Sequence, residues 1–179
     1  MESRPKDKER FAGVIRPFQE SDVPAVKAIL EYWLVDNGVI ARDEVEEDIS
    51  DMRRSLEPDS DIDMFVVEKD GQVVGMMGLS IPPKEPLLRY AKTNSPSELR
   101  IAYVHPYYVM GQGLGTALIA KCQDLARNKG AKEILLESGP RHRETGHPFY
   151  DKQPGFNRVG VLPNFYGPGL HSTVWQKTF

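Results

Sequence analysis

Three alternate glycines lie between a strand-like segment and an amphipathic helix. The strand-like segment covers residues 99–104, the glycines are Gly111, Gly113 and Gly115, and apolar residues then recur at helical spacing as far as Gly130. Glycine lets the backbone approach a ligand closely and adopt positive φ angles, so that successive N–H groups can converge on one anion. The helix that begins there adds unsatisfied N–H groups and the positive end of its dipole. The segment therefore predicts a pyrophosphate site at the start of a βαβ crossover.

Other glycine-rich phosphate sites match this segment less well. A P-loop requires Gly-Lys followed by Ser or Thr, which the segment lacks. The dinucleotide fingerprint is partly imitated by Gly111, Gly113 and a later acid, Glu133 or Glu137. Its third glycine position is occupied by Thr116, however, and the front half of the chain lacks the βαβ start of that fold. A nicotinamide-dinucleotide binder and a glycine-rich connection without a ligand remain the weaker alternatives.

The remaining pattern predicts a single mixed α/β chain with an antiparallel front half. Strands are expected at residues 14–18, 64–69, 72–79, 99–104 and 133–138, and near 157–162 and 171–177, and helices at 22–34, 43–56 and 114–130, with a short one after 138. Asp70-Gly71 is a hairpin signal between two of these strands. Residues 82–97 contain four prolines, and we expect them to form a flexible excursion near a binding surface.

Composition restricts the class of protein. The chain has 179 residues, 40% apolar and 27% charged, which fits one globular domain over residues 13–179 after a charged, flexible tail over 1–12. Its one cysteine, Cys122, falls on the apolar stripe of a helix and is expected in the core. The net charge of -3 argues against general nucleic-acid binding. Neither a signal peptide nor a membrane span is evident, so we expect a cytoplasmic protein.

Two segments of the chain resemble the motifs of the GNAT superfamily of N-acetyltransferases. Val104-His105-Pro106 before the glycine turn resembles its acetyl-CoA motif, and Phe149-Tyr150-Asp151-Lys152 followed by Gly155-Phe156 resembles its second motif. The resemblance covers residues 13–179. It implies a GNAT-like α/β fold, with a mixed, mostly antiparallel central sheet of about seven strands and helices on both faces. The chain departs from the pattern at Met110, where the family carries Gln or Arg.

The resemblance also implies an acetyl-CoA-dependent N-acetyltransferase that needs no metal. Acetyl would pass by direct attack in a ternary complex to a primary amine, on a small molecule or a peptide N-terminus. The implied acetyl-CoA-binding residues are Ala102, Tyr103, Val104, Met110, Gly111, Gln112, Gly113, Leu114, Gly115 and Thr116. The alternative is a non-catalytic module that senses a CoA ester. The expected partner is the amine acceptor, without nucleic acid or membrane, and a homodimer stays open.

Three residues are candidates for proton transfer during acetylation. A phenol has a pKa close enough to that of a thiol to exchange a proton, so Tyr150 is the candidate general acid, unless its ring only packs between Phe149 and Phe156. Glu98, just before a strand, is the candidate base, unless it is a solvated acid or a partner of Arg100. Glu137 is the reserve base.

Two further groups of residues have open interpretations. Arg141, His142 and Arg143 form a basic cluster that meets a phosphate or acidic substrate group, or is simply solvated. Phe165 and Tyr166 lie in a glycine-proline loop, where they wall the acceptor site or an interface, or plug the loop from beneath. None of the four histidines, His105, His142, His147 and His171, shows metal-ligand spacing, and we expect each at the surface.

Overall fold

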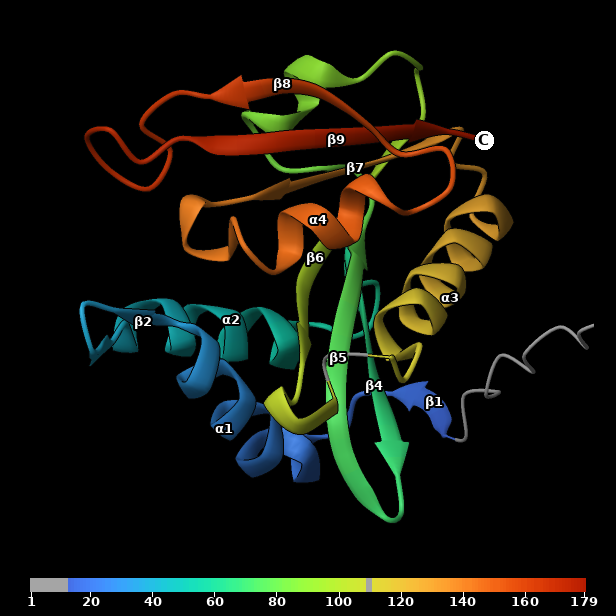
Figure 1. Cartoon of the computed structure of the whole chain (residues 1–179). Coiled ribbons are helices and arrows are strands. Elements are labelled where there is room, and N and C mark those ends of the chain that lie inside the picture. The colour runs from blue at the N-terminus through green and yellow to red at the C-terminus, as the bar shows by residue number, and fades with distance from the viewer. Residues whose placement is uncertain (1–12, 109–110) are drawn as a thin grey trace, which may run out of the picture.

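One seven-stranded sheet runs through the computed structural model, which describes residues 13–108 and 111–179 (Figure 1). The strand order is β1 (Val14–Pro17), β4 (Ile62–Lys69), β5 (Gln72–Ser80), β6 (Pro96–Val104), β7 (Glu133–Ser138), β9 (Ser172–Thr178) and β8 (Asn157–Leu162). Every neighbouring pair is antiparallel except β6 and β7. The expected mostly antiparallel sheet is confirmed. The tail predicted at residues 1–12, and Met110, lie outside the described residues.

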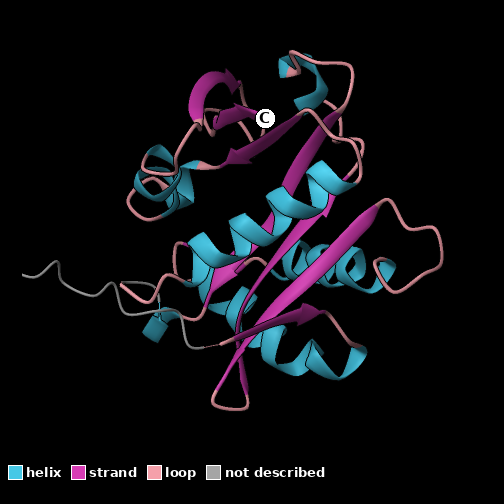
Figure 2. Ribbon diagram, turned by 90° about the vertical axis from the view of Figure 1, so that its right-hand side faces the viewer, coloured by secondary structure: helices cyan, strands magenta, loops and turns pink. Residues whose placement is uncertain are grey.

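Helices cover both faces of the sheet, as expected. α1 (Val23–Trp33) and α2 (Arg42–Arg54) cover one face, and α3 (Leu114–Asn128) and α4 (Gly146–Asp151) cover the other (Figure 2). Alternate side chains of β4 supply the two cores, because successive strand residues point to opposite faces. Cys122 of α3 is fully buried, and burial raises the pKa of its thiol, which confirms its place in the core. None of the helices within the described residues is long and apolar enough to cross a membrane.

The proline-rich excursion is held down along its length. Leu87, in a 3₁₀ turn over Leu87–Tyr90, is buried, and the Tyr90 hydroxyl donates to the carbonyl of Val161 at 2.7 Å. Part of the excursion becomes strand, because β6 begins at Pro96 rather than at the expected Leu99. The excursion is thus a packed segment, because Leu87 lies against side chains of β7, β8 and β9 that are distant in the chain. Its residues 84–87 line the cavity described below, which agrees with the expected position near a binding surface.

A short hairpin after α1 was not predicted. It pairs β2 (Val35–Asp36) with β3 (Val39–Ile40) around Asn37 and Gly38, which both have positive φ. Asn-Gly is a strong two-residue turn signal, so the sequence did contain the information. The strands are too short for their alternation to be recognised.

The parallel pair β6 and β7 parts after only three residue pairs. Residues 96–98 pair with 133–135, and the two strands then diverge (Figure 1). On the other edge of β6 the register with β5 shifts, and Ile101 has a φ of 51°. This is a β-bulge, which bends a strand and strengthens its twist. Within the part of the chain that the structure describes, the edge of β6 that faces β7 has no strand partner over residues 99–104.

Glu133 anchors the closed end of this divergence. Its fully buried carboxylate accepts from the backbone N–H groups of Lys92 and Thr93 at 2.6–3.0 Å and from the amide of Gln176 at 2.9 Å. Its backbone carbonyl accepts from the hydroxyl of Ser97 at 2.7 Å. These bonds hold the pKa of the Glu133 carboxyl below its usual value despite its burial. One side chain thus joins β7, β9 and the chain that leads into β6.

Replacing Glu133 by Gln should destabilise the protein by roughly 1–3 kcal/mol at neutral pH, because an amide group would face backbone N–H donors. The carboxylate stabilises the fold fully above its unfolded-state pKa, and this contribution is lost as pH falls through the lowered folded-state pKa. The difference in the free energy of unfolding between wild type and Glu133→Gln, measured in urea, should therefore become smaller in acid. Glu57→Gln, at an exposed position, is the control. Equal stability of wild type and Glu133→Gln at neutral pH would contradict the prediction.

Candidate active site

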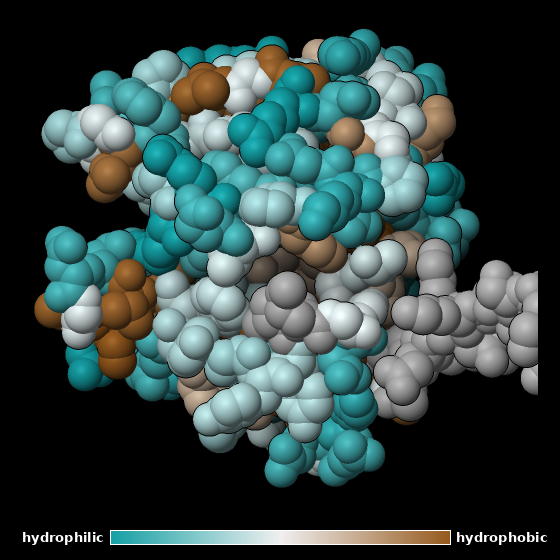
Figure 3. Space-filling view, viewed as in Figure 1, coloured by the Kyte–Doolittle hydropathy of each residue, from teal (hydrophilic) through white to brown (hydrophobic). Residues whose placement is uncertain are grey.

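A cavity of about 1070 Å³ occupies the divergence of β6 and β7. Its lining comes from both helical layers, from the end of α1 and the N-terminal half of α2 on one side and from the start of α3 and most of α4 on the other. The surface is hollowed between the half of the molecule that carries β7–β9 and the half that carries α1 and α2 (Figure 3). A ligand in this cavity can reach the unpaired edge of β6.

The glycine turn forms one end of the cavity. Gly111 and Gly113 have φ angles of 78° and 68°, and Gly113 is the N-cap of α3. A Cβ added to either glycine would meet nothing within 4 Å, so open space lies in front of both. The first turn of α3 contains no acidic residue, and its first N–H groups have no intrahelical acceptor. The turn therefore fits a diphosphate, which these N–H groups and the helix dipole would stabilise.

Gly115 has a different purpose from its neighbours. A Cβ on Gly115 would lie 2.8 Å from Cζ of Phe149, so this glycine allows α3 to pack closely against α4. Thr116 follows it on the cavity wall, and its hydroxyl accepts from the amide of Gln153 at 3.4 Å. The glycine turn thus combines a ligand-facing part with a packing part.

Most of the expected acetyl-CoA-binding residues line this cavity. They are Ala102, Tyr103, Val104, Gly111, Gly113, Leu114, Gly115 and Thr116. Gln112 does not, because its side-chain oxygen accepts from the Lys69 ammonium at 2.8 Å, away from the cavity. The prediction for Gln112 concerns its backbone N–H in the glycine turn, and this contact of its side chain does not test it. Met110 lies outside the described residues.

Tyr150 projects from α4 into the cavity wall. Its side chain is almost fully buried, with ring centroids 5.2 Å from Phe149 and 5.5 Å from Trp175. Its aromatic neighbours thus include Trp175 of β9, which the sequence did not indicate. Burial raises the pKa of Tyr150, so its hydroxyl stays protonated at neutral pH. The site therefore holds a proton donor with a fixed orientation.

Glu98 lies on β6 where the strands part. It is 7% exposed, accepts from the backbone N–H of Lys84 at 2.8 Å, and has Oε1 3.8 Å from Nε of Arg100. Burial raises the pKa of its carboxyl. Glu98 is thus both a cavity-lining acid and a partner of Arg100, which also pairs with Asp51.

Glu137 ends β7 on the same wall of the cavity. It accepts from the hydroxyl of Tyr166 at 2.7 Å and from that of Ser172, and burial raises its pKa. The Tyr166 ring lies so close to Gly139 that a Cβ there would be 2.7 Å from it. Tyr166 and its neighbour Phe165 both line the cavity, which confirms that the β8–β9 loop forms part of its wall.

The basic cluster after β7 is divided: Arg143 is exposed, as one alternative expected, whereas Arg141 is bound by acids of the protein. Arg141 is 18% exposed and binds both Asp36 of the β2–β3 hairpin, at 2.9 Å, and Glu44 of α2, at 2.9–3.0 Å. These ion pairs tie the segment after β7 to the α2 layer. The expected role of Arg141 was wrong because both partners are about a hundred residues away in the chain.

Two histidines expected at the surface are covered. His142 packs edge-on against Trp33 and Tyr103, with ring centroids 6.2 and 5.7 Å away, and burial lowers its pKa to about 4. His147 is 5% exposed and lies 3.1 Å from two backbone carbonyls. No group of three or more metal-ligating side chains occurs within residues 13–108 and 111–179.

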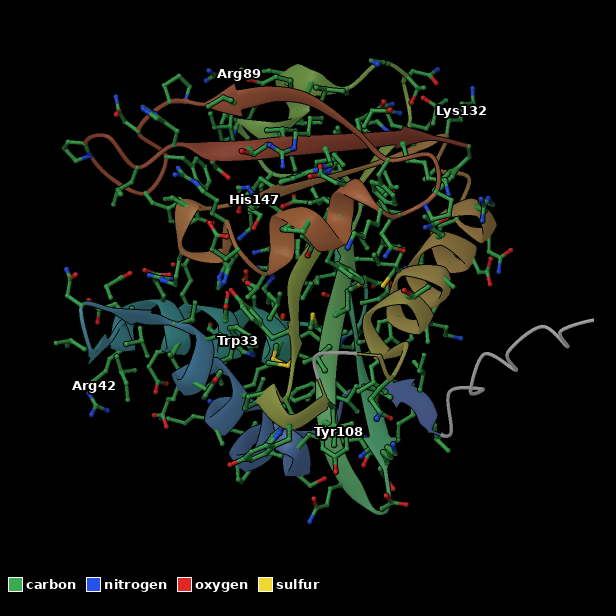
Figure 4. All side chains as sticks on the ribbon, viewed as in Figure 1. Trp33, Arg42, Arg89, Tyr108, Lys132 and His147 are labelled. Carbon is green, nitrogen blue, oxygen red and sulfur yellow. The ribbon has the colours of Figure 1, made fainter. Side chains whose placement is uncertain are left out.

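Two cavity residues, Trp33 and Asp48, were not singled out from the sequence. Trp33 ends α1, and its indole donates to the backbone carbonyl of Val104 at 2.8 Å (Figure 4). Asp48 is on α2, where Glu44, Asp48 and Asp51 recur at helical spacing on one side. That acidic periodicity was a usable signal for a charged wall. A lone tryptophan among apolar helix residues gave no comparable signal.

Known proteins similar to this chain are acetyltransferases. The model of the acetyltransferase (GNAT) family matches residues 26–156. Glucosamine 6-phosphate N-acetyltransferase of Trypanosoma brucei brucei is 33% identical over 104 residues, which are 58% of this chain and 63%, less than two thirds, of that protein.

Solved structures with the same fold belong to this group. A GNAT-family protein from Desulfovibrio desulfuricans has a TM-score of 0.74 and 18% identity, with 93% of this chain and 99% of that one covered. PaiA N-acetyltransferase from Thermoplasma acidophilum, in complex with coenzyme A, has a TM-score of 0.65 and 19% identity, with 94% and 99% covered. With the family model matching more than half of its length, this chain belongs to the GNAT family of acetyltransferases.

Proposed function

We propose that this chain is an acetyl-CoA-dependent N-acetyltransferase that transfers acetyl to a primary amine, of a small molecule or a peptide N-terminus, within a ternary complex. The observation that carries the proposal is the continuous cavity from the N-terminus of α3 to Tyr150 and Glu98, along the unpaired edge of β6. The relative from Trypanosoma brucei brucei, itself named as an N-acetyltransferase, supports the same reaction class.

The α3 end of the cavity supports binding of the cosubstrate. The backbone N–H groups from Gly113 to Thr116 would hold the diphosphate, since they lie at the positive end of the helix dipole. The pantetheine arm would then lie along residues 102–104, where β6 has no pairing with β7 and can offer main-chain hydrogen bonds. This arrangement would place the thioester where the strands part.

The chemistry requires an acceptor amine that has lost its proton and a donor for the departing sulfur. Glu98 would take the amine proton through a water molecule, and burial, which raises its pKa, makes it a stronger base than an ordinary Glu. Tyr150 would donate its proton, or a hydrogen bond, to the sulfur. Because burial raises the pKa of Tyr150 above that of a free phenol, its hydroxyl stays protonated at neutral pH and would donate a hydrogen bond to the sulfur more readily than the proton itself.

Acetyl-CoA should raise the melting temperature of the wild-type protein by about 5–10 °C at a hundredfold excess over its dissociation constant. Gly113→Glu should abolish this shift, because a carboxylate would occupy the place of the diphosphate. Gly130→Glu is a matched control, since Gly130 also has a positive φ, of 83°, and open space around it, but lies at the opposite end of α3. An unchanged melting curve of the wild type at millimolar acetyl-CoA would reject the proposal.

Tyr150→Phe should lower kcat roughly 10²–10⁴-fold while the acetyl-CoA melting shift remains, because only the hydroxyl is lost. Release of free CoA thiol in the presence of an amine panel measures turnover. Tyr107→Phe, at an 89% exposed position, is the control. Unchanged kcat in Tyr150→Phe would remove Tyr150 from the mechanism. Acetyl-CoA binding without turnover of any amine would instead favour the non-catalytic sensor.

A further inference from the structure

The part of the cavity opposite the α3 N-terminus is rich in carboxylates. This part, which we call the acceptor half, is formed by α2, β6, β7 and the β8–β9 loop, and its acids are Glu44, Glu47, Asp48, Glu98 and Glu137. Two cationic side chains line it, Lys84 and Arg100, and both bind Asp51. Asp51 also binds Arg54, and Arg100 lies 3.8 Å from Glu98, so both cations of the acceptor half already have carboxylate partners within the protein. The acceptor half carries an excess of negative charge.

Asp48 differs from the other buried acids of this wall because it has no internal partner. Glu44 binds Arg141, and Glu98 and Glu137 each accept hydrogen bonds from the protein. Asp48 makes no hydrogen bond or ion pair with any of the described residues, although it is partly buried. Desolvation and the neighbouring acids Asp51, Glu47 and Glu44 raise its pKa to about 7, against the opposing effect of Arg100. A cation beside Asp48 would relieve this cost.

Aromatic rings complete the acceptor half. Trp33, Tyr103, Phe165 and Tyr166 all line the cavity there. Their faces can cover the methylene groups of an aliphatic chain, and they attract cations through the ring quadrupole. Carboxylates interspersed with aromatic rings suit a chain that alternates ammonium and methylene groups. A compact anionic sugar does not match this lining.

We propose that the acceptor is a linear di- or polyamine, with one amino group acetylated beside Glu98 and a second, charged ammonium bound by Asp48. The proposal rests on the N-acetyltransferase function proposed above. Lys84 and Arg100, the cationic side chains of the acceptor half, are paired with Asp51, so they oppose a cationic acceptor less than free cations would.

The competing interpretation is an acceptor that carries an anionic group near Arg100. The Nη1 atom of Arg100 is buried and has no hydrogen-bond partner among the described residues, so it could donate to a phosphate or carboxylate. Such an anion, however, would lie beside Asp51 and Glu98, both of which already contact the same guanidinium. Repulsion from these acids would oppose its binding.

Three acceptors with four carbon atoms each distinguish between the two interpretations: 1,4-diaminobutane, n-butylamine and 4-aminobutanoate, whose far ends are cationic, neutral and anionic. The wild type should show a kcat/KM for the diamine roughly 10–100-fold above that for the monoamine, the gain from one charge-assisted contact. It should use 4-aminobutanoate least. In Asp48→Asn the ratio of diamine to monoamine should collapse toward one. Asp43→Asn, an equal change of charge at an exposed position of α2, should keep the wild-type ratio.

Glucosamine 6-phosphate is assayed beside the series, with the acetyl-CoA melting shift measured on the same samples. Three results overturn the polyamine proposal if the acetyl-CoA melting shift is normal: equal use of the three acceptors, no turnover of the diamine, or a preference for glucosamine 6-phosphate. Each of these results leaves acetyl-CoA binding intact. An unaltered diamine ratio in Asp48→Asn overturns the role of Asp48. Absence of the melting shift refutes the proposed function itself, and the polyamine proposal with it.

Discussion

The divergence of β6 from β7 is the constraint on which the rest of the site depends. A parallel pair that stayed in register would have satisfied its own backbone groups and left no cavity between the helical layers. Pairing instead stops at Glu98, and the bulge at Ile101 bends β6 away. Backbone polar groups removed from a strand partner need another one. The Trp33 indole supplies a donor to the Val104 carbonyl, and a ligand in the cavity can supply more.

The cavity that results has opposite electrostatic character at its two ends. At one end the α3 N-terminus presents N–H groups and no acid in its first turn. At the other end carboxylates of α2, β6 and β7 gather, with Arg100 held between Asp51 and Glu98. Such a field draws an anion and a cation to opposite ends. Tyr150 and Glu98 both line the cavity, and burial raises the pKa of each.

Segments from distant parts of the chain hold the acceptor half together. Arg141 connects the end of β7 to the β2–β3 hairpin and α2 through Asp36 and Glu44. Glu137 fixes the β8–β9 loop through Tyr166. The Arg141 guanidinium is mostly buried, so removal of either carboxylate would leave its charge partly unpaired. The shape of the wall therefore depends on contacts between side chains from distant segments of the chain.

Features that depend on local chemistry followed from the sequence. The strand alternation in residues 64–79, the Asp70-Gly71 turn and the stripe that buries Cys122 were all predicted, because each depends on residues close in the chain. The glycine turn was located for the same reason, and its motif led to the GNAT family. Its boundaries and its open face agree with the structure.

Only the tertiary structure decided which side chains meet. The partners of Arg141, the burial of His142 and the isolation of Asp48 all arise from elements far apart in the chain, where neither spacing nor propensity carries information. The hydrogen bond from Lys69 of β4 to the Gln112 side chain is another contact between residues far apart in the chain. The sequence alone determined the family and the position of the glycine turn. The tertiary structure determined the charge of the acceptor half, because that charge depends on which ionisable groups form ion pairs and which do not.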